Sequence, residues 1–154
     1  MILDALILQT KLFLSEDMDI EIQDVVVDDT NPEKLILQNY TSMIGTGGSL
    51  NSMVIVSFDK LLLKSLVDIF MDGEEVEEDE KDEVFTSVTG ETLNTIIGLS
   101  LPIFPNRGKG ITITPPVAIG DASSIKKDKN SKILKATVNT EFGKMDICII
   151  SAEI

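Results

Sequence analysis

Two apolar runs joined by a glycine-rich segment constrain the fold of this chain more than any other feature. The runs, Lys34–Thr46 and Leu50–Phe58, both resemble β-strands. Between them stands Gly45-Thr46-Gly47-Gly48-Ser49, which lacks the Gly-Lys-Ser/Thr ending of a phosphate-binding loop and precedes a strand rather than a helix. We therefore expect a hairpin turn at this segment, and strands joined by a hairpin are antiparallel.

The remaining periodic segments supply helices and further strands. Apolar spacing predicts helices over residues 2–14, 60–71 and 79–100; Asp59 is expected to cap the second, and Asp72-Gly73 to end it. Strand patterns cover residues 17–29, 110–119, 133–140 and 144–153, with a bulge or edge at Pro115-Pro116 and a polar loop over 121–131.

The order of these elements defines the expected fold class. One helix is followed by three strands, two helices and three strands, which indicates an α+β protein. We expect an antiparallel sheet of about six strands with three helices packed on one face. The length of 154 residues predicts a single domain, 1–154.

A strong negative charge excludes several kinds of partner. Asp and Glu total 26 against 13 Lys and Arg, so the net charge is −13. Such a chain has no basic patch for the phosphates of nucleic acid or for anionic membranes. We therefore expect proteins or metal-bearing sites as partners. Residues 74–83 hold eight carboxylates without the spacing of a calcium loop, so a solvated acidic helix start is favoured and no metal site of the chain's own is predicted.

The absence of histidine removes most familiar catalytic arrangements. Without His there is no Ser-His-Asp or Cys-His triad and no HExxH zinc site. The single Cys148 is best interpreted as a small buried hydrophobic residue in a reducing compartment. The apolar N-terminal stretch is broken by Asp4, Gln9 and Lys11 and has no basic leader, so we expect neither a signal peptide nor a spanning helix, and a cytoplasmic location.

The candidate functional residues lie in the third predicted helix. Ser87, Glu91 and Asn94 are spaced by four and three residues, which puts them on one helix face. Apolar residues mark the opposite side, and we expect the ones that mostly face the sheet to be Val84, Val88, Leu93 and Ile97. An exposed carboxylate beside an exposed carboxamide is a poor core element and a plausible place for chemistry on a partner.

This segment resembles the signature of the chemotaxis phosphatases CheC, CheX and FliY. The similarity includes Gly90-Glu91-x-x-Asn94-x-Ile96-x-Gly98 and extends to the flanking segments Met71–Asp79 and Ile113–Gly120 and the strand ending Val54–Phe58. It therefore spans nearly the whole sequence. The chain has one Glu-x-x-Asn pair, which resembles CheX rather than CheC, where the motif is duplicated.

The resemblance implies a substrate and residue roles. The substrate would be a phosphorylated CheY-type response regulator, whose Mg²⁺ belongs to the regulator, so the chain needs no cofactor of its own. Asn94 would orient the attacking water, and Glu91 would pair with the regulator's active-site lysine. Ser87 would also contact the partner, although it fits equally well as an ordinary surface residue.

Three matters stay open at the level of sequence. Many family members have Asn where this chain has Ser100, and the sequence does not indicate what this difference does. CheX-type proteins form homodimers, so a homodimer is implied, and the strands around residues 34–58 are expected to leave the edges for it. The alternative function is a non-catalytic binding or adaptor module of the same fold in chemotaxis, flagellar-motor or other two-component signalling. A third interpretation is a scaffold without an active site.

Overall fold

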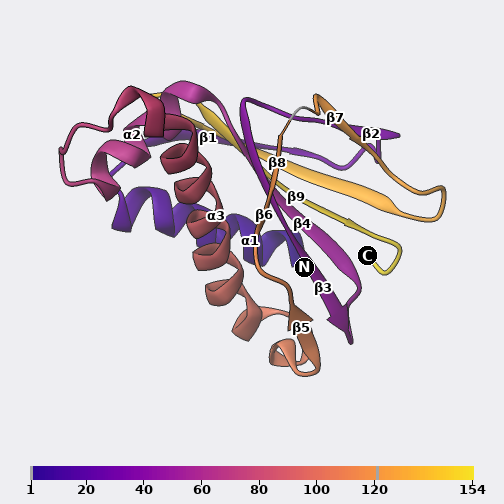
Figure 1. Cartoon of the computed structure of the whole chain (residues 1–154). Coiled ribbons are helices and arrows are strands. Elements are labelled where there is room, and N and C mark those ends of the chain that lie inside the picture. The colour runs from indigo at the N-terminus through magenta and orange to yellow at the C-terminus, as the bar shows by residue number, and fades with distance from the viewer. Residues whose placement is uncertain (1, 121) are drawn as a thin grey trace.

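A computed structural model of the chain describes residues 2–120 and 122–154, and Figure 1 shows its arrangement. Within these residues there are three α-helices: α1 (Ile2–Leu12), α2 (Lys60–Phe70) and α3 (Lys81–Ser100). The strands are β1 (Ile22–Asp28), β2 (Lys34–Ile36), β3 (Tyr40–Gly48), β4 (Ser52–Phe58), β5 (Ile111–Ile113), β6 (Val117–Ile119), β7 (Ser124–Lys126), β8 (Lys132–Thr140) and β9 (Lys144–Ser151).

The main sheet is antiparallel throughout. Its order is β1-β8-β9-β4-β3-β5, and β6 also pairs with β3. The β3–β4 hairpin pairs Tyr40 with Phe58 and Thr46 with Ser52, so the glycine-rich segment does form a hairpin, with β3 continuing to Gly48. Gly48 has a φ of 75°, and a Cβ there would stand 2.0 Å from the Gly110 carbonyl oxygen. Only glycine fits this close approach of two backbones.

All three helices cover one face of the main sheet, as Figure 1 shows. The α+β class with an antiparallel sheet and helices on one face is therefore confirmed. Strand β9 explains the layering, because alternate side chains point to opposite faces. Met145, Ile147 and Ile149 join the core beneath the helices, whereas Cys148 and Ile150 belong to a second, smaller core.

The second core lies under a two-stranded ribbon, β2 paired with β7. Leu35 of β2 packs there with Ile55, Ile133, Cys148 and Ile150.

The ribbon corrects two of the sequence predictions. Residues 34–46 form two strands in different sheets, not one, and the predicted loop over 121–131 contains β7; its first residue, Asp121, lies outside the described residues. One buried residue of β2, Leu35, and one partly buried residue of β7, Ile125, hold the ribbon on this core, and each strand is too short to show periodicity.

Other element bounds also differ from the expectation. Helix α1 extends into a wider π-type turn over Phe13–Asp17, so the first strand begins at Ile22 rather than at residue 17. The strand predicted over 110–119 is split into β5 and β6, because Pro115 and Pro116 lack the N–H groups that a continuous ladder needs. The expected bulge or edge is thus a break, and both pieces pair with β3.

The Asp59 cap is confirmed and has a second role. One carboxylate oxygen accepts from the Leu62 N–H at 2.8 Å, and the other accepts from the Lys144 N–H at 2.7 Å. The cap therefore joins the start of α2 to the β8–β9 turn. A Cβ on Gly143 would lie 2.4 Å from the same carboxylate, which makes glycine necessary there.

A buried polar network joins the entry of β3 to the sheet. Asp146 of β9 is 5% exposed, and its carboxylate accepts from the Gln38 side-chain amide at 2.9 Å and from the Thr137 hydroxyl. The Gln38 backbone N–H donates to the Ser57 hydroxyl at 2.7 Å, and that hydroxyl lies 2.8 Å from the Thr41 hydroxyl. Buried carboxylates persist when such donors satisfy them. The network holds the β2–β3 connection on the sheet.

We predict that Asp146→Ala lowers the free energy of unfolding by about 1.5–3 kcal/mol, because it leaves the half-buried Gln38 and Thr137 donors without their acceptor. Urea unfolding measures this change. The matched control is Asp24→Ala, whose exposed carboxylate accepts one hydrogen bond from Asn139 at 2.6 Å and whose loss should cost less than about 0.5 kcal/mol. Equal losses in the two variants would contradict the structural role of Asp146.

Candidate functional site

Helix α3 separates a buried side from a polar side. Val88, Leu93 and Ile97 are buried as predicted, whereas Val84 is only half-buried and lies at the margin of the core. On the other side Ser87 and Glu91 are exposed and Asn94 is half-buried. The predicted site residues therefore share one face of one helix, and none of them is in the core.

Buried hydroxyl groups on α3 are satisfied within the helix. Thr89, Thr92 and Ser100 are at most 1% exposed, and each donates to the carbonyl four residues earlier, at 2.7–2.8 Å. These residues can thus sit in the core without partners elsewhere. One of them is Ser100, the residue that stands where many family members have Asn and whose role the sequence left open. It bonds to the Ile96 carbonyl and takes no part in the polar face.

An open depression of about 350 Å³ adjoins the three predicted residues. Its first wall is α3, with Ser87, Glu91 and Asn94. Its second wall comes from β3 and from the β5–β6 connection, through Ser42 and Pro116. The structure therefore brings all three predicted residues together and adds a wall that sequence reasoning did not assign to the site.

The two walls meet at Gly90 and Pro116. A Cβ added to Gly90 would lie 3.4 Å from the Pro116 Cβ, an ordinary van der Waals contact, so the proline lies close to the helix with no side chain of Gly90 between them. Glycine within a helix costs roughly 1 kcal/mol relative to alanine. That cost was the available signal in the sequence: a glycine inside a helix often marks a close approach by another segment.

Glu91 and Asn94 are free to interact with another molecule. Among the described residues, neither the Glu91 carboxylate nor the Asn94 side-chain amide makes a hydrogen bond or ion pair. The nearby Thr95 hydroxyl donates to the Glu91 backbone carbonyl at 3.0 Å. An amide can donate and accept at the same time, and a carboxylate accepts only. The depression thus offers both kinds of group on a rigid helix.

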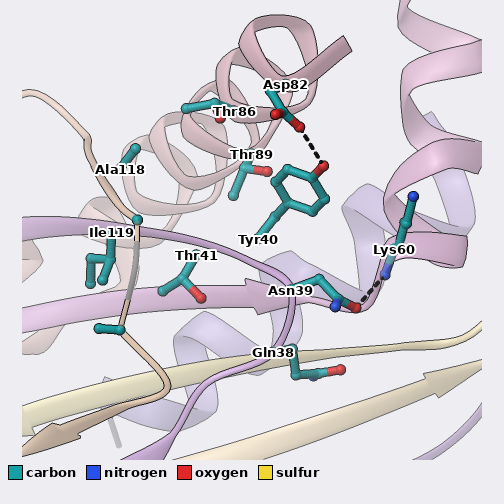
Figure 2. A pocket seen from close by; sticks show the side chains of 12 residues that line it. Gln38, Asn39, Tyr40, Thr41, Lys60, Asp82, Thr86, Thr89, Ala118 and Ile119 are labelled. Atoms are coloured by element: carbon teal, nitrogen blue, oxygen red, sulfur yellow. Dashed lines mark hydrogen bonds between the residues drawn. The ribbon is translucent and has the colours of Figure 1, made fainter. Parts of the chain in front are cut away.

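A larger pocket of about 590 Å³ continues from the depression, and the two share Thr86 and Ala118. In Figure 2, Tyr40 and Asp82 stand on one side of this pocket and Ala118 and Ile119 on the other. The Tyr40 hydroxyl donates to the Asp82 carboxylate at 3.0 Å. The Tyr40 ring packs on Phe85, with ring centroids 5.3 Å apart.

The surroundings shift the pKa of two groups. Partial burial, followed by the hydrogen bond and the negative charge of Asp82, raises the pKa of Tyr40 above 10.0. Burial, and secondarily the Asp146 carboxylate, raises the pKa of the Cys148 thiol well above its usual value. The thiol is thus inert and buried, in agreement with the interpretation of Cys148 as a small hydrophobic residue.

The described residues contain neither a metal-binding cluster nor a membrane-spanning helix. No cluster of three or more His, Cys, Asp or Glu side chains there has the geometry to hold a metal ion. Likewise, no helix in that part of the chain is both long and apolar enough to cross a membrane.

Comparison with known proteins decides the family. The family model for the chemotaxis phosphatase CheX matches residues 40–139, well over half of the chain. The chain belongs to the CheX family. The match contains all of α3 and its motif, together with the β3–β6 segments that build the second wall. A search of curated proteins found no match.

Solved structures of CheX proteins have the same fold. CheX from Desulfovibrio desulfuricans is 18% identical with a TM-score of 0.77, covering 96% of this chain and 97% of that one. CheX from Vibrio vulnificus is 15% identical with a TM-score of 0.72, at 96% and 94% coverage. CheX in the CheX-CheY-BeF3-Mg²⁺ complex from Borrelia burgdorferi is 19% identical with a TM-score of 0.71, at 98% and 97%.

The pKa of Tyr40 can be measured directly in this CheX-family chain, which has one Tyr and no Trp. We predict a tyrosinate absorbance titration with its midpoint above pH 10.0, and a lower midpoint in Asp82→Asn, which keeps an acceptor but removes the charge. Because folding favours the neutral phenol, this stabilisation is complete below the unfolded pKa and is lost as the pH rises through the folded one.

The control for this titration is Asp29→Asn, which removes the same charge at an exposed position after β1, on the far edge of the sheet. Its midpoint should equal that of the unaltered chain. A midpoint that Asp82→Asn leaves unchanged would contradict the contact between Tyr40 and Asp82.

Proposed function

We propose that this chain hydrolyses the aspartyl phosphate of a CheY-type response regulator. The observation that carries the proposal is the placement of Glu91 and Asn94 one helical turn apart in an open depression on α3, where neither side chain has a hydrogen-bond partner among the described residues. Membership of the CheX family supports the same reaction, as does the CheX protein that forms a complex with CheY, BeF3 and Mg²⁺.

Asn94 is proposed as the catalytic group. Its amide oxygen would accept a hydrogen bond from a water molecule, and its amide N–H would donate to the water or the phosphoryl oxygens, with no change of charge. The water oxygen would bond to phosphorus as the bond from phosphorus to the aspartyl oxygen breaks. The products are inorganic phosphate and the regulator's free carboxylate. Holding water in line in this way would lower the activation free energy by several kcal/mol.

Glu91 is proposed as the docking group. Its carboxylate would pair with the lysine of the regulator's active site, and Ser87, one turn earlier, would contact the same partner. The regulator's own Mg²⁺ supplies charge stabilisation at the phosphoryl group. This arrangement needs no cofactor from the chain. The negative charge of the chain, −13 in all, opposes docking onto an acidic regulator pocket, and the regulator's lysine and Mg²⁺ would offset that repulsion.

A homodimer also remains a prediction, but its expected location must be corrected. The strands in residues 34–58 leave no long edge, because β4 lies between β9 and β3, and β3 is covered by β5 and β6. The long edge of the main sheet is β1, where Val26 and Val27 are 56% and 50% exposed. Such an edge is the natural place for pairing with a second copy.

We also propose that the chain works in the cytoplasm, where a CheY-type regulator would be met.

The first test replaces Asn94 with alanine. We predict that Asn94→Ala slows dephosphorylation of one cognate regulator by about a hundredfold or more, while its affinity for the regulator activated with beryllofluoride is nearly kept. Alanine is a better helix former than asparagine, so the variant should remain folded. Single-turnover release of labelled phosphate measures the step.

A matched control is Thr95→Ala, which removes a neighbouring polar side chain of α3 that does not line the depression. Its rate should stay within about twofold of the parent chain, as expected for a surface change. If Asn94→Ala is as fast as the parent chain, the catalytic assignment is wrong. The non-catalytic binding module then replaces it.

The second test replaces Glu91 with alanine. We predict that Glu91→Ala weakens association with the regulator by about 2–5 kcal/mol, since it leaves the partner's lysine without its carboxylate in the interface. Isothermal titration calorimetry measures the affinity. At saturating regulator much of the rate should return, which distinguishes Glu91 from Asn94. An unchanged affinity would remove Glu91 from the docking role.

A further inference from the structure

The pocket over Tyr40 belongs to the same surface as the motif. Asp82, Thr86, Gly90 and Asn94 recur every four residues, so they follow one face of α3. Thr86 and Gly90 line the depression beside Asn94, and Asp82 and Thr86 line the pocket of about 590 Å³. The two hollows thus form one continuous groove between α3 and the β5–β6 segment.

The pocket is formed in advance by contacts within the chain. Tyr40 is fixed by its ring contact with Phe85 and by its hydrogen bond to Asp82. The Asn39 side chain accepts from the Lys60 backbone N–H at 3.0 Å, as Figure 2 shows. The opposite wall, Ala118 and Ile119, is held by the pairing of β6 with β3. Little ordering would therefore accompany occupation.

The floor of the pocket is also anchored. Gln38 lines it and is bonded to Asp146 and Ser57 in the buried network of the sheet. A ligand group entering the pocket would thus meet a surface that the sheet already holds in place. This distinguishes the pocket from a flexible surface hollow.

Asp82 offers the pocket a carboxylate for a cation. Among the described residues the lining contains one cation, Lys60, and one anion, Asp82, and the adjoining residues 74–83 carry eight carboxylates. The positive charge of Lys60 helps to lower the pKa of Glu78, after the larger contribution of Lys81, so Lys60 faces the acidic segment that precedes α3. Glu78 itself is paired with Lys81 at 2.8 Å. Asp82 has only the neutral Tyr40 hydroxyl as its hydrogen-bond partner among the described residues.

We propose that this pocket is a second docking point for the same response regulator and receives one of its lysine or arginine side chains against Asp82. The inference rests on the proposed function, because the regulator is placed by Glu91 and Asn94. Asp82 and Asn94 are 12 residues apart on α3, which corresponds to about 18 Å. A typical interface of about 800 Å² per partner is some 30 Å across and reaches about 15 Å from its centre. Glu91 is nine residues from Asp82, or about 14 Å along the helix, so a protein centred on Glu91 reaches the pocket at its rim.

A contact at the rim of an interface can be told from a catalytic contact by the kinetic quantity that it changes. A charged pair there contributes mainly through attraction at encounter and depends on salt, whereas a group at the reacting atoms changes the chemical step. Asp82 should therefore influence association and leave the turnover of bound regulator unchanged. Its role differs in this respect from that proposed for Asn94.

The test measures affinity separately from catalysis. The chain and its Asp82→Asn variant are titrated with a cognate CheY-type regulator activated by beryllofluoride and Mg²⁺, at 50 and 300 mM salt. Asparagine keeps an acceptor for the Tyr40 hydroxyl, so the pocket remains built. We expect binding about 3–10-fold weaker at low salt, a smaller salt dependence, and an unchanged rate at saturating regulator. Asp29→Asn, an equal loss of charge at the far edge, should bind as the parent chain does.

A second readout locates the contact. With ring-¹³C-tyrosine in the chain and none in the regulator, all labelled resonances come from Tyr40, since it is the only tyrosine. Addition of the regulator should shift them in the parent chain and in Asn94→Ala alike. If they do not shift, or if Asp82→Asn and Asp29→Asn bind equally well, the docking point is overturned.

Other outcomes are equally informative. A fall in turnover with unchanged affinity in Asp82→Asn would mean that Asp82 only supports α3, and would overturn the proposal. So would Tyr40 shifts that follow the chain's own concentration, because a second copy would then occupy the pocket. If the chain binds the regulator but releases no phosphate, the proposed function fails, while the affinities of Asp82→Asn and Asp29→Asn still decide the docking point.

Discussion

The contact of α3 with the sheet determines where the polar groups of the site lie. On the side of α3 that faces the sheet, Leu93, Ile96 and Ile97 are fully buried, in the same core as Val54 and Val56 of β4. Because a helix repeats every 3.6 residues, burying this side turns Ser87, Glu91 and Asn94 outward. The hydroxyls of the buried threonines bond within α3, so the packed side makes no polar demand on its neighbours.

The second constraint is the approach of Pro116 to Gly90. It brings the β5–β6 connection against the helix and converts an exposed helix face into a walled depression. The same connection pairs with β3 on both sides of the break, at Gly48 and at Met43. The proline pair thus interrupts a strand and supplies a wall of the site. Contacts with the sheet and with this connection fix the orientation of α3, so Glu91 and Asn94 are presented to a partner in a constant geometry.

Local patterns predicted the parts of this structure that depend on neighbours in sequence. The Asp59 cap, the glycine-rich hairpin and the polar face of α3 each follow from residues within one or two turns. The ribbon of β2 and β7 did not, since three-residue strands carry too little periodicity and their pairing joins residues far apart in the chain. For the same reason the pocket over Tyr40, which gathers residues from four separate segments, had no sequence signal.

The central claim is that this CheX-family chain is a phosphatase and not only a binding module. The most direct measurement is the loss of radiolabel from a phosphorylated cognate regulator, with and without a substoichiometric amount of the chain. We predict release at least about tenfold faster with the chain, and more phosphate released than there are molecules of chain, because the proposed role of Asn94 would let one chain align a water in each of many turnovers. A regulator that loses its label at the same rate with and without the chain would contradict it.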